Sequence, residues 1–320
     1  MTSALITGIT GQDGGYLAER LIAEGCVVHG LVHDGDPHVE DLRARVPAAV
    51  LHNGDLTDEA SLARVVADSA PDEVYNFAGI SSVAFSWERP VLTADITALG
   101  AARLLEQVWQ HQERTGSAVH FVQASSAEIF GDALVAPQNE STPVQPNSPY
   151  GASKAFAHQL VAVYRGRGLH AVSTILYNHE SPRRPPTFVT RKITRAAARI
   201  AQGLEHELVL GNLDARRDWG WAPDYVDAMV RAARHTSAGD YVVATGEART
   251  VREFVEAAFV RAGVQDWEPL VRSDPAFFRP VDAALQVGDA TKARTELGWA
   301  PTVDFAELVG RMVDADLRPA

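Results

Sequence analysis

Three glycines follow the first apolar segment of the chain and open its first predicted helix. Residues 3 to 23 read as a buried strand, a turn that contains Gly8, Gly11 and Gly14, and a helix. Glycines in such a turn let the backbone approach a pyrophosphate, and the amino terminus of the following helix favours its negative charge. A second strand is predicted from Cys26 to Val32. This order of elements predicts an α/β fold that binds a dinucleotide.

Apolar strand patterns alternate with helical patterns through residues 1 to 177, which is typical of a doubly wound parallel sheet of the Rossmann type. After Tyr177, the proline-rich segment 178–186 cannot continue a helix. We therefore expect a dinucleotide-binding domain at 1–177 and a smaller α/β substrate-binding region at 178–320, with some segments of the second returning to the first. Further strands are predicted at Ala49–His52, Glu73–Phe77, Val119–Ala124 and Ala171–Tyr177, and helices at Pro90–Gln112, Pro149–Arg165, Thr187–Gly203, Pro223–His235, Val251–Gly263 and Phe305–Asp314.

Composition excludes several classes of protein. The 320 residues are 46% hydrophobic and 22% charged, so the chain can bury a large core. A net charge of −12 argues against binding to nucleic acid or to anionic membrane surfaces. We expect neither a membrane span nor a secretion signal, because no apolar run is long enough. The single cysteine, Cys26, allows no internal disulfide and no cysteine metal cluster, which favours a cytoplasmic protein without a metal site.

Residues 121 to 154 carry a possible active site. Tyr150 and Lys154 lie four residues apart in a predicted helix, so the ammonium group can sit near the phenol and favour its ionised form. Ser126 and Glu128 lie two apart at the end of a predicted strand, so their side chains are expected to point to the same side. Either pair alone has a plainer reading, as an exposed helical pair or as a helix-capping pattern.

Other charged residues are candidates for binding the ligands. Asp34 follows Gly14 by about 20 residues, where an acid often holds the ribose of a dinucleotide. Lys192 with Arg191, and Arg217 and Arg279, could neutralise a small anion, although a solvated surface charge is the plainer reading of any one of them. 

Longer motifs resemble those of the GDP-mannose 4,6-dehydratase family, a group of extended short-chain dehydrogenases/reductases. The resemblance covers nearly the whole chain. It includes ALITGITGQDG at 4–14, GDLTD at 54–58, TADITALGAARLLE at 93–106, FVQASSAEIFG at 121–131, SPYGASK at 148–154, NHESPRR at 178–184, FVTRKITRAAARIAQG at 188–203, GNLDARRDWG at 211–220, FFRP at 277–280 and GDATKARTELGW at 288–299.

The resemblance implies a catalytic role for each of four residues. Tyr150 would take the proton of the sugar's 4-hydroxyl while hydride leaves carbon 4, and Lys154 would tune Tyr150 and hold the cofactor ribose. Glu128 would then remove the proton of carbon 5 and help to expel the 6-hydroxyl as water, with Ser126 hydrogen-bonded to the sugar. Hydride would return to carbon 6, so the cofactor should stay tightly bound and the product would be a 4-keto-6-deoxy nucleotide sugar.

The resemblance also implies the binding residues. The cofactor would contact the glycine turn, which includes Gln12 and Asp13, and its adenine would lie beside Asp55 and Leu56. The diphosphate of a nucleotide sugar, with a GDP-hexose favoured, would be held by Asn178, Lys192 and Arg217. Further substrate positions are Ser81, Val189, Arg279 and Asp282, the last near the nucleoside ribose.

Departures from the family pattern modify these expectations. Ser126 replaces the usual threonine but keeps the hydroxyl, whereas Ile80 and Ser82 replace an amide and an imidazole near the sugar, which puts the sugar specificity in question. After the second strand, His33 and Asp34 replace paired arginines that bind the 2′-phosphate of NADP, which favours NAD over NADP. The same connection is shorter than usual, and in the family it helps to build a tetramer, so we expect a homodimer. The segment before residue 277 is also short.

Three functions remain open from the sequence. A 4,6-dehydratase requires Glu128 and a retained cofactor. A nucleotide-sugar 4-reductase or epimerase on the same scaffold is the alternative, and a reductase needs no acid at Glu128. A non-catalytic nucleotide-sensing protein need not keep Tyr150 and Lys154. The intact set of four residues favours the dehydratase.

Overall fold

The computed structural model describes residues 1–278 and 285–318. Seven strands form one parallel sheet in the order β10-β6-β5-β4-β1-β2-β3. The prediction of a doubly wound α/β fold is confirmed. The strands are β1 (Ser3–Thr7), β2 (Val27–Val32), β3 (Val50–Asn53), β4 (Glu73–Asn76), β5 (His120–Ala124), β6 (His170–Leu176) and β10 (Asp240–Val243).

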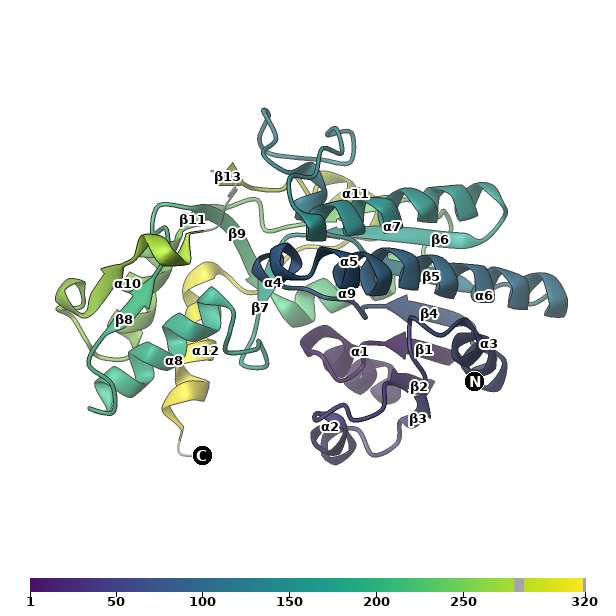
Figure 1. Cartoon of the computed structure of the whole chain (residues 1–320), viewed down its shortest axis with the longest axis horizontal. Helices are drawn as coiled ribbons and strands as arrows, with labels where there is room; N and C mark the ends of the chain where they lie inside the picture. Colours follow the sequence, from purple (N-terminus) through teal and green to yellow (C-terminus); the bar gives the residue numbers. More distant parts are fainter. Residues whose placement is uncertain (279–284, 319–320) are drawn as a thin grey trace.

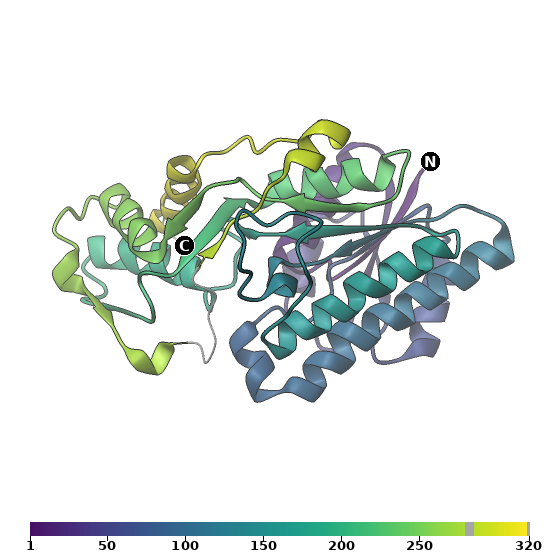
Figure 2. The ribbon, with the colours of Figure 1, turned by 90° about the horizontal axis from the view of Figure 1, so that it is seen from above.

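Helices cover both faces of this sheet, as Figures 1 and 2 show. On one face, α6 (Gly100–Thr115) packs against α3 (Glu59–Ser69) and α7 (Pro149–Gly166). On the other, α1 (Gln12–Ala23) packs against α9 (Ala222–Arg234), which also contacts β5 and β6. Each layer buries its own apolar cluster against the sheet, which explains the nearly continuous apolar strands.

The sequence predicts one helix over Pro90–Gln112, but the structure divides this segment. It contains α5 (Pro90–Thr93), a π-helical segment η1 (Ala94–Leu99) and then α6, which continues to Thr115. A short helix α4 (Val83–Glu88) precedes them, and α2 (Val39–Arg45) connects β2 to β3.

Most of the remaining segments form a second, smaller part of the molecule with its own apolar core. In it, β9 (Arg216–Trp221) pairs with β7 (Asn178–Glu180), β11 (Ala248–Thr250) and β13 (Leu285–Gln286), while β8 (Leu208–Leu210) pairs with β12 (Val271–Ser273). Helices α8 (Val189–Ala201), α10 (Val251–Arg261) and α12 (Phe305–Leu317) pack together over this part. The segments α9, β10 and α11 (Thr291–Leu297) instead pack on the seven-stranded sheet or extend it.

After β1, the chain continues to β2 and β3 on one side of β1. After β3, it crosses to β4 on the other side, so β1 and β4 form the switch point of the sheet. In open α/β sheets, ligands bind beyond the carboxyl ends of the strands at such a point. No helix within 1–278 and 285–318 has both the length and the apolar character needed to cross a membrane.

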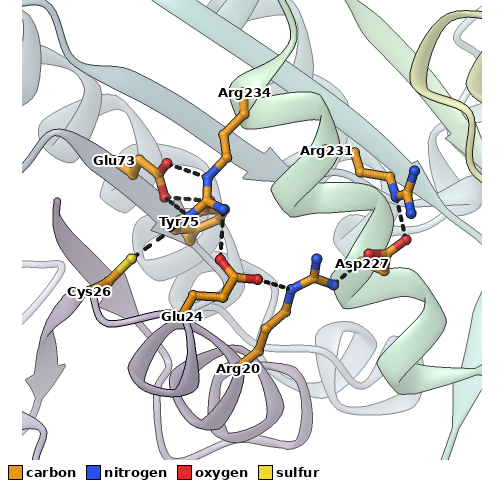
Figure 3. Close-up of polar contacts among 8 residues, drawn as sticks. All are labelled: Arg20, Glu24, Cys26, Glu73, Tyr75, Asp227, Arg231 and Arg234. Carbon is orange, nitrogen blue, oxygen red and sulfur yellow. Dashed lines mark hydrogen bonds and ion pairs between the residues drawn. The ribbon is translucent and has the colours of Figure 1, made fainter.

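A polar network links α9 to β4 and α1 at the opposite, amino-terminal end of the strands (Figure 3). Arg234, the last residue of α9, contacts Glu73 Oε1 at 2.7 Å through Nε and Glu24 Oε2 at 2.7 Å through Nη1. Glu73 is buried and also accepts a hydrogen bond of 2.8 Å from the hydroxyl of Tyr75. Arg20 connects Glu24 to Asp227 of α9. Arg234 thus ties α9 to both β4 and the end of α1.

We expect Arg234→Ala to lower the free energy of unfolding by about 2–3 kcal/mol, because Glu73 would keep a buried charge without its cationic partner. Urea denaturation of the two proteins measures this difference. The control is Arg43→Ala, because Arg43 forms a mostly exposed pair with Glu40. Such pairs contribute about 0–1 kcal/mol. Equal losses in both variants would contradict the role assigned to Arg234.

Candidate active site

Two adjoining cavities lie beyond the carboxyl ends of the central strands. One, of about 530 Å³, surrounds the glycine turn, and we call it the glycine-turn cavity. The other, of about 420 Å³, contains Tyr150, and we call it the Tyr150 cavity. The two cavities adjoin, because five residues line both: Asp13, Phe77, Ser81, Arg184 and Phe188.

The geometry of the glycine turn fits a bound pyrophosphate. Gly8 has a φ of +68°, and a Cβ there would lie 2.8 Å from the backbone nitrogen of Ala78, so only glycine fits this turn. Gly11 precedes α1 and offers no side chain to cap it. The first N–H groups of α1 therefore remain available to an anion beside the cavity. All the residues predicted in the turn line this cavity, namely Gly8, Gly11, Gln12, Asp13 and Gly14, as do Asp55 and Leu56.

The structure does not bring Asp34 to this cavity. Gly35, with a φ of +76°, reverses the chain directly after it. The carboxylate of Asp34 accepts a hydrogen bond of 2.6 Å from Asn53 at the end of β3. The acid that lines the cavity is instead Asp36, two residues later. Asp36 is therefore a second candidate for the ribose beside Asp34, whose role stays a prediction, because the spacing rule does not account for a turn at Gly35.

In the Tyr150 cavity, the four predicted catalytic residues come together as lining residues. Ser148 caps α7 by accepting a hydrogen bond from the backbone of Gly151, which places Tyr150 in the first turn of the helix. A Cβ on Gly151 would lie 2.5 Å from the carbonyl oxygen of Glu128. Glycine at this position therefore lets α7 approach closely enough to bring Tyr150 beside Ser126 and Glu128.

Ser126 and Glu128 meet by a different local structure from the predicted one. The strand β5 ends at Ala124, and Ser126 caps a 3₁₀ turn, Ala127–Phe130, by accepting a hydrogen bond of 3.2 Å from the backbone of Glu128. Strand alternation is therefore wrong as the reason for their proximity. The same Ser126–Glu128 contact is therefore both a helix cap and part of the site, because the cap holds Glu128 next to Ser126.

The electrostatics of Tyr150 also differ from the sequence expectation. Burial raises the pKa of Tyr150 to about 12, against a hydrogen bond with Ser126 that lowers it, and the charge of Glu128 raises it further. Lys154 lies 5.8 Å from the Tyr150 ring centroid, and its Nζ donates a 2.9 Å hydrogen bond to the carbonyl of Ala124. Burial lowers the pKa of Lys154 to about 8, with Asp13 acting in the opposite direction. In this arrangement Lys154 lies close to the phenol, while its ammonium group is held by the carbonyl of Ala124.

The predicted nucleotide-sugar residues divide into three groups. Ser81, Asn178, Val189 and Lys192 line the Tyr150 cavity, and Lys192 lies 4.8 Å from the ring centroid of Phe277. Arg217 is buried in β9 and lines neither cavity, and Arg191 pairs with Asp316 of α12. Arg279 and Asp282 lie outside the described residues.

Two residues of the segment after β6 border the site but were not chosen from the sequence. Arg184 lines both cavities, stacks on Phe188 and pairs with Glu180 at 3.2 Å. His179 contacts Asp13 of the glycine turn at 2.9 Å. Both lie in the segment NHESPRR, whose several charges were the available signal.

The surroundings of His179 favour its protonated form. Its Nδ1 contacts the carbonyl of Tyr177 at 2.7 Å and its Nε2 contacts the carboxylate of Asp13, and both partners accept hydrogen bonds. Burial alone would lower the pKa of His179, but the charge and hydrogen bond of Asp13 raise it above its usual value. Burial alone would raise the pKa of Asp13, but His179 holds it below its usual value. This pair joins the glycine turn to β7.

The Asp13–His179 pair makes stability depend on pH. Because folding raises the pKa of His179, the folded protein keeps a proton that the unfolded chain releases above about pH 6.5, so this contribution declines as pH rises. At the acidic end, it declines as pH falls through the lowered pKa of Asp13, below 3.8. We expect Asp13→Asn to cost about 2–3 kcal/mol near pH 6 and progressively less at higher pH. Urea denaturation of both nucleotide-free proteins at several pH values tests this, and a difference independent of pH would contradict it.

Comparisons with known proteins agree on one family. A family model described as GDP-mannose 4,6 dehydratase matches residues 5–312. GDP-mannose 4,6 dehydratase 1 of Arabidopsis thaliana is 48% identical over 331 residues, which cover 99% of this chain and 90% of that protein. GDP-mannose 4,6-dehydratase of Vibrio cholerae is 42% identical over 357 residues, covering 99% and 94%.

A solved structure with a similar fold contains a dinucleotide. UDP-glucose 4-epimerase of Thermus thermophilus in complex with NAD superposes with a TM-score of 0.85 and 30% sequence identity, covering 98% of each chain. 

Proposed function

The chain belongs to the GDP-mannose 4,6-dehydratase family, and from that premise we infer that it removes water from GDP-mannose to form the 4-keto-6-deoxy derivative. The observation that carries this function is the placement of Glu128 in one cavity with Ser126, Tyr150 and Lys154. A reductase on this scaffold has no need of a carboxylate at that place. The cofactor is a nicotinamide dinucleotide, as in the related epimerase complex with NAD.

When bound, the dinucleotide supplies a hydride acceptor that later becomes the donor. We propose that Tyr150 takes the proton from the 4-hydroxyl of the sugar as hydride leaves carbon 4, and that Ser126 hydrogen-bonds the same oxygen. Lys154 is mostly protonated below about pH 8 and provides the positive charge that a phenolate needs nearby. The ketone at carbon 4 acidifies carbon 5. Glu128 then removes the proton of carbon 5 and protonates the leaving 6-hydroxyl, so that water departs and a double bond forms between carbons 5 and 6. The product would be completed when carbon 6 receives the hydride back and carbon 5 receives a proton.

The binding roles follow the two cavities. The glycine turn with the start of α1 would hold the cofactor pyrophosphate, Asp55 and Leu56 would border its adenine, and Lys154 its nicotinamide ribose. At the sugar nucleotide, we propose Asn178 and Lys192 for the diphosphate, with Ser81 and Val189 along the wall of the same cavity. Arg217, Arg279 and Asp282 are proposed for the nucleotide end on the basis of the family motif.

Mass spectrometry of GDP-mannose and other nucleotide hexoses, each incubated with the protein and a trace of cofactor, tests the function. We expect GDP-mannose to lose one water without net reduction of the cofactor. Conversion to an isomer of the same mass would instead indicate an epimerase, and stoichiometric consumption of reduced cofactor a reductase. In those cases Ile80 and Ser82 would be the first residues to replace.

We also propose that the protein is a homodimer in the cytoplasm. The adjacent segments α5, η1 and α7 carry exposed apolar side chains, including Val91, Leu99, Phe156 and Val163, and we propose that they form one face. A second copy of the chain would cover this face. The single free cysteine, Cys26, suits a reducing compartment.

We expect Phe156→Arg to convert the dimer to a monomer, because a charge in the proposed interface would lose its solvation on association. Light scattering after size-exclusion chromatography measures the mass of the particle. Val260→Arg is the control, because Val260 has a similar exposure on α10, in the other part of the molecule. A wild-type protein that is monomeric at micromolar concentration would refute the dimer directly.

A further inference from the structure

The loop between β2 and α2 carries two acids, and the structure assigns them different positions. Asp34 lies outside the glycine-turn cavity, whereas Asp36 lines it together with His33, Pro37 and His38. The loop therefore forms one wall of the cavity at the end of β2. In this fold the end of the second strand is where the adenosine ribose of a dinucleotide lies.

The carboxylate of Asp36 is fixed on both oxygens. Thr10, in the glycine turn, donates its hydroxyl to Oδ2 at 2.8 Å, and the backbone N–H of His38 donates to Oδ1 at 2.9 Å. The turn that directs Asp36 inward is closed by a 3.2 Å hydrogen bond from its own N–H to the carbonyl of His33. The φ of +76° at Gly35 makes this turn possible. Asp36 is thus connected to the turn that holds the pyrophosphate.

Charged side chains are distributed unevenly around the glycine-turn cavity. Among the described lining residues, Arg184 is the sole arginine or lysine, and it lies on the boundary shared with the Tyr150 cavity. The wall near the end of β2 has Asp36, and Asp55 follows β3. A 2′-phosphate on the adenosine ribose would therefore meet a fixed carboxylate and no guanidinium or ammonium group of the described lining.

We propose that Asp36 determines the choice of cofactor, by accepting a hydrogen bond from a hydroxyl of the adenosine ribose in NAD and by repelling the 2′-phosphate of NADP. The proposal rests on the proposed function, in that the glycine-turn cavity must hold a nicotinamide dinucleotide. It assigns to Asp36, held by Thr10, the role that sequence spacing gave to Asp34.

Binding titrations separate this proposal from the catalytic one, because they require no turnover. Nucleotide released from the purified protein is identified by mass spectrometry, and the stripped protein is then titrated calorimetrically with NAD and with NADP. The titrations use about pH 8, where histidine side chains carry little charge. We expect NAD in the purified protein and at least tenfold tighter binding of NAD than of NADP.

Matched variants identify the responsible residue. Asp36→Asn should reduce the preference for NAD to about threefold or less, mainly by strengthening the binding of NADP. Asp34→Asn removes the same charge from the same loop and should leave most of the preference in place. Higher salt should reduce the ratio of NAD affinity to NADP affinity in the wild-type protein, because salt screens charge repulsion. The same ratio should not change with salt in Asp36→Asn.

Three results would overturn the proposal. The first is equal or tighter binding of NADP by the wild-type protein, which needs no variant to fold. The second is a preference lost in Asp34→Asn and kept in Asp36→Asn. The third is a preference unchanged in both variants. If the protein binds NAD more tightly than NADP but does not dehydrate GDP-mannose, the proposed function is contradicted and the role of Asp36 is not.

Discussion

Replacing Glu128 by glutamine is expected to reduce water loss from GDP-mannose by about a hundredfold to ten-thousandfold, because the amide can neither accept the proton of carbon 5 nor donate one to the leaving hydroxyl. The substitution preserves the size of the side chain and the hydrogen bond from the backbone of residue 128 to Ser126. Oxidation at carbon 4 should remain measurable, since that step depends on Tyr150. Mass spectrometry measures the loss of water from the sugar nucleotide. The absorbance of reduced nicotinamide in a single turnover measures oxidation at carbon 4.

The matched control for this variant is Asp132→Asn. Asp132 is an exposed acid four positions further along the same segment and lines neither cavity. Its removal should leave dehydration within about twofold of the wild-type rate, as for a surface substitution away from the site. Unchanged dehydration in Glu128→Gln would remove Glu128 from the mechanism.

Tyr150→Phe is expected to have a comparably large effect on an earlier step. The phenol is buried, hydrogen-bonded to Ser126, and held by α7 next to Glu128. Phenylalanine fills the same space but offers no oxygen to take the proton of the 4-hydroxyl. We expect carbon 4 oxidation, and with it dehydration, to fall by about a hundredfold to ten-thousandfold. The same transient absorbance measurement should show no early reduction of the nicotinamide.

Tyr164→Phe provides the comparison on the same helix. The hydroxyl of Tyr164 donates to Glu106 on the outer side of α7 and α6, away from both cavities. Its loss should leave the reaction rate nearly unchanged. If Tyr150→Phe oxidises carbon 4 at the wild-type rate while its thermal unfolding is also unchanged, another group must act as the base.

Much of the scaffold could be predicted from local sequence. The glycine turn, six strands of the parallel sheet and the joint placement of Ser126, Glu128, Tyr150 and Lys154 depend on periodicity, on turn residues and on motifs that lie close together in the chain; the seventh strand, β10, was not predicted. These features are set by short-range geometry, and the structure reproduces them even where Ser126 and Glu128 reach each other by a cap rather than by strand alternation.

What could not be predicted depends on contacts between distant segments or on single turns. Asp13 and His179 are far apart in the chain, so their pairing appears only when β7 is placed beside the glycine turn. The exchange of Asp34 for Asp36 at the cavity depends on one positive φ at Gly35. Lys154 donates to the carbonyl of Ala124 because that strand end lies under α7, which no helical spacing reveals.

Arg184 and Phe188 form a common wall of the two cavities. This wall comes from the single segment between β7 and α8, so a change in that segment alters both cavities at once. A catalyst that returns its hydride within each cycle needs its sugar and its dinucleotide side by side, and a wall common to both cavities sets the distance between those two ligands.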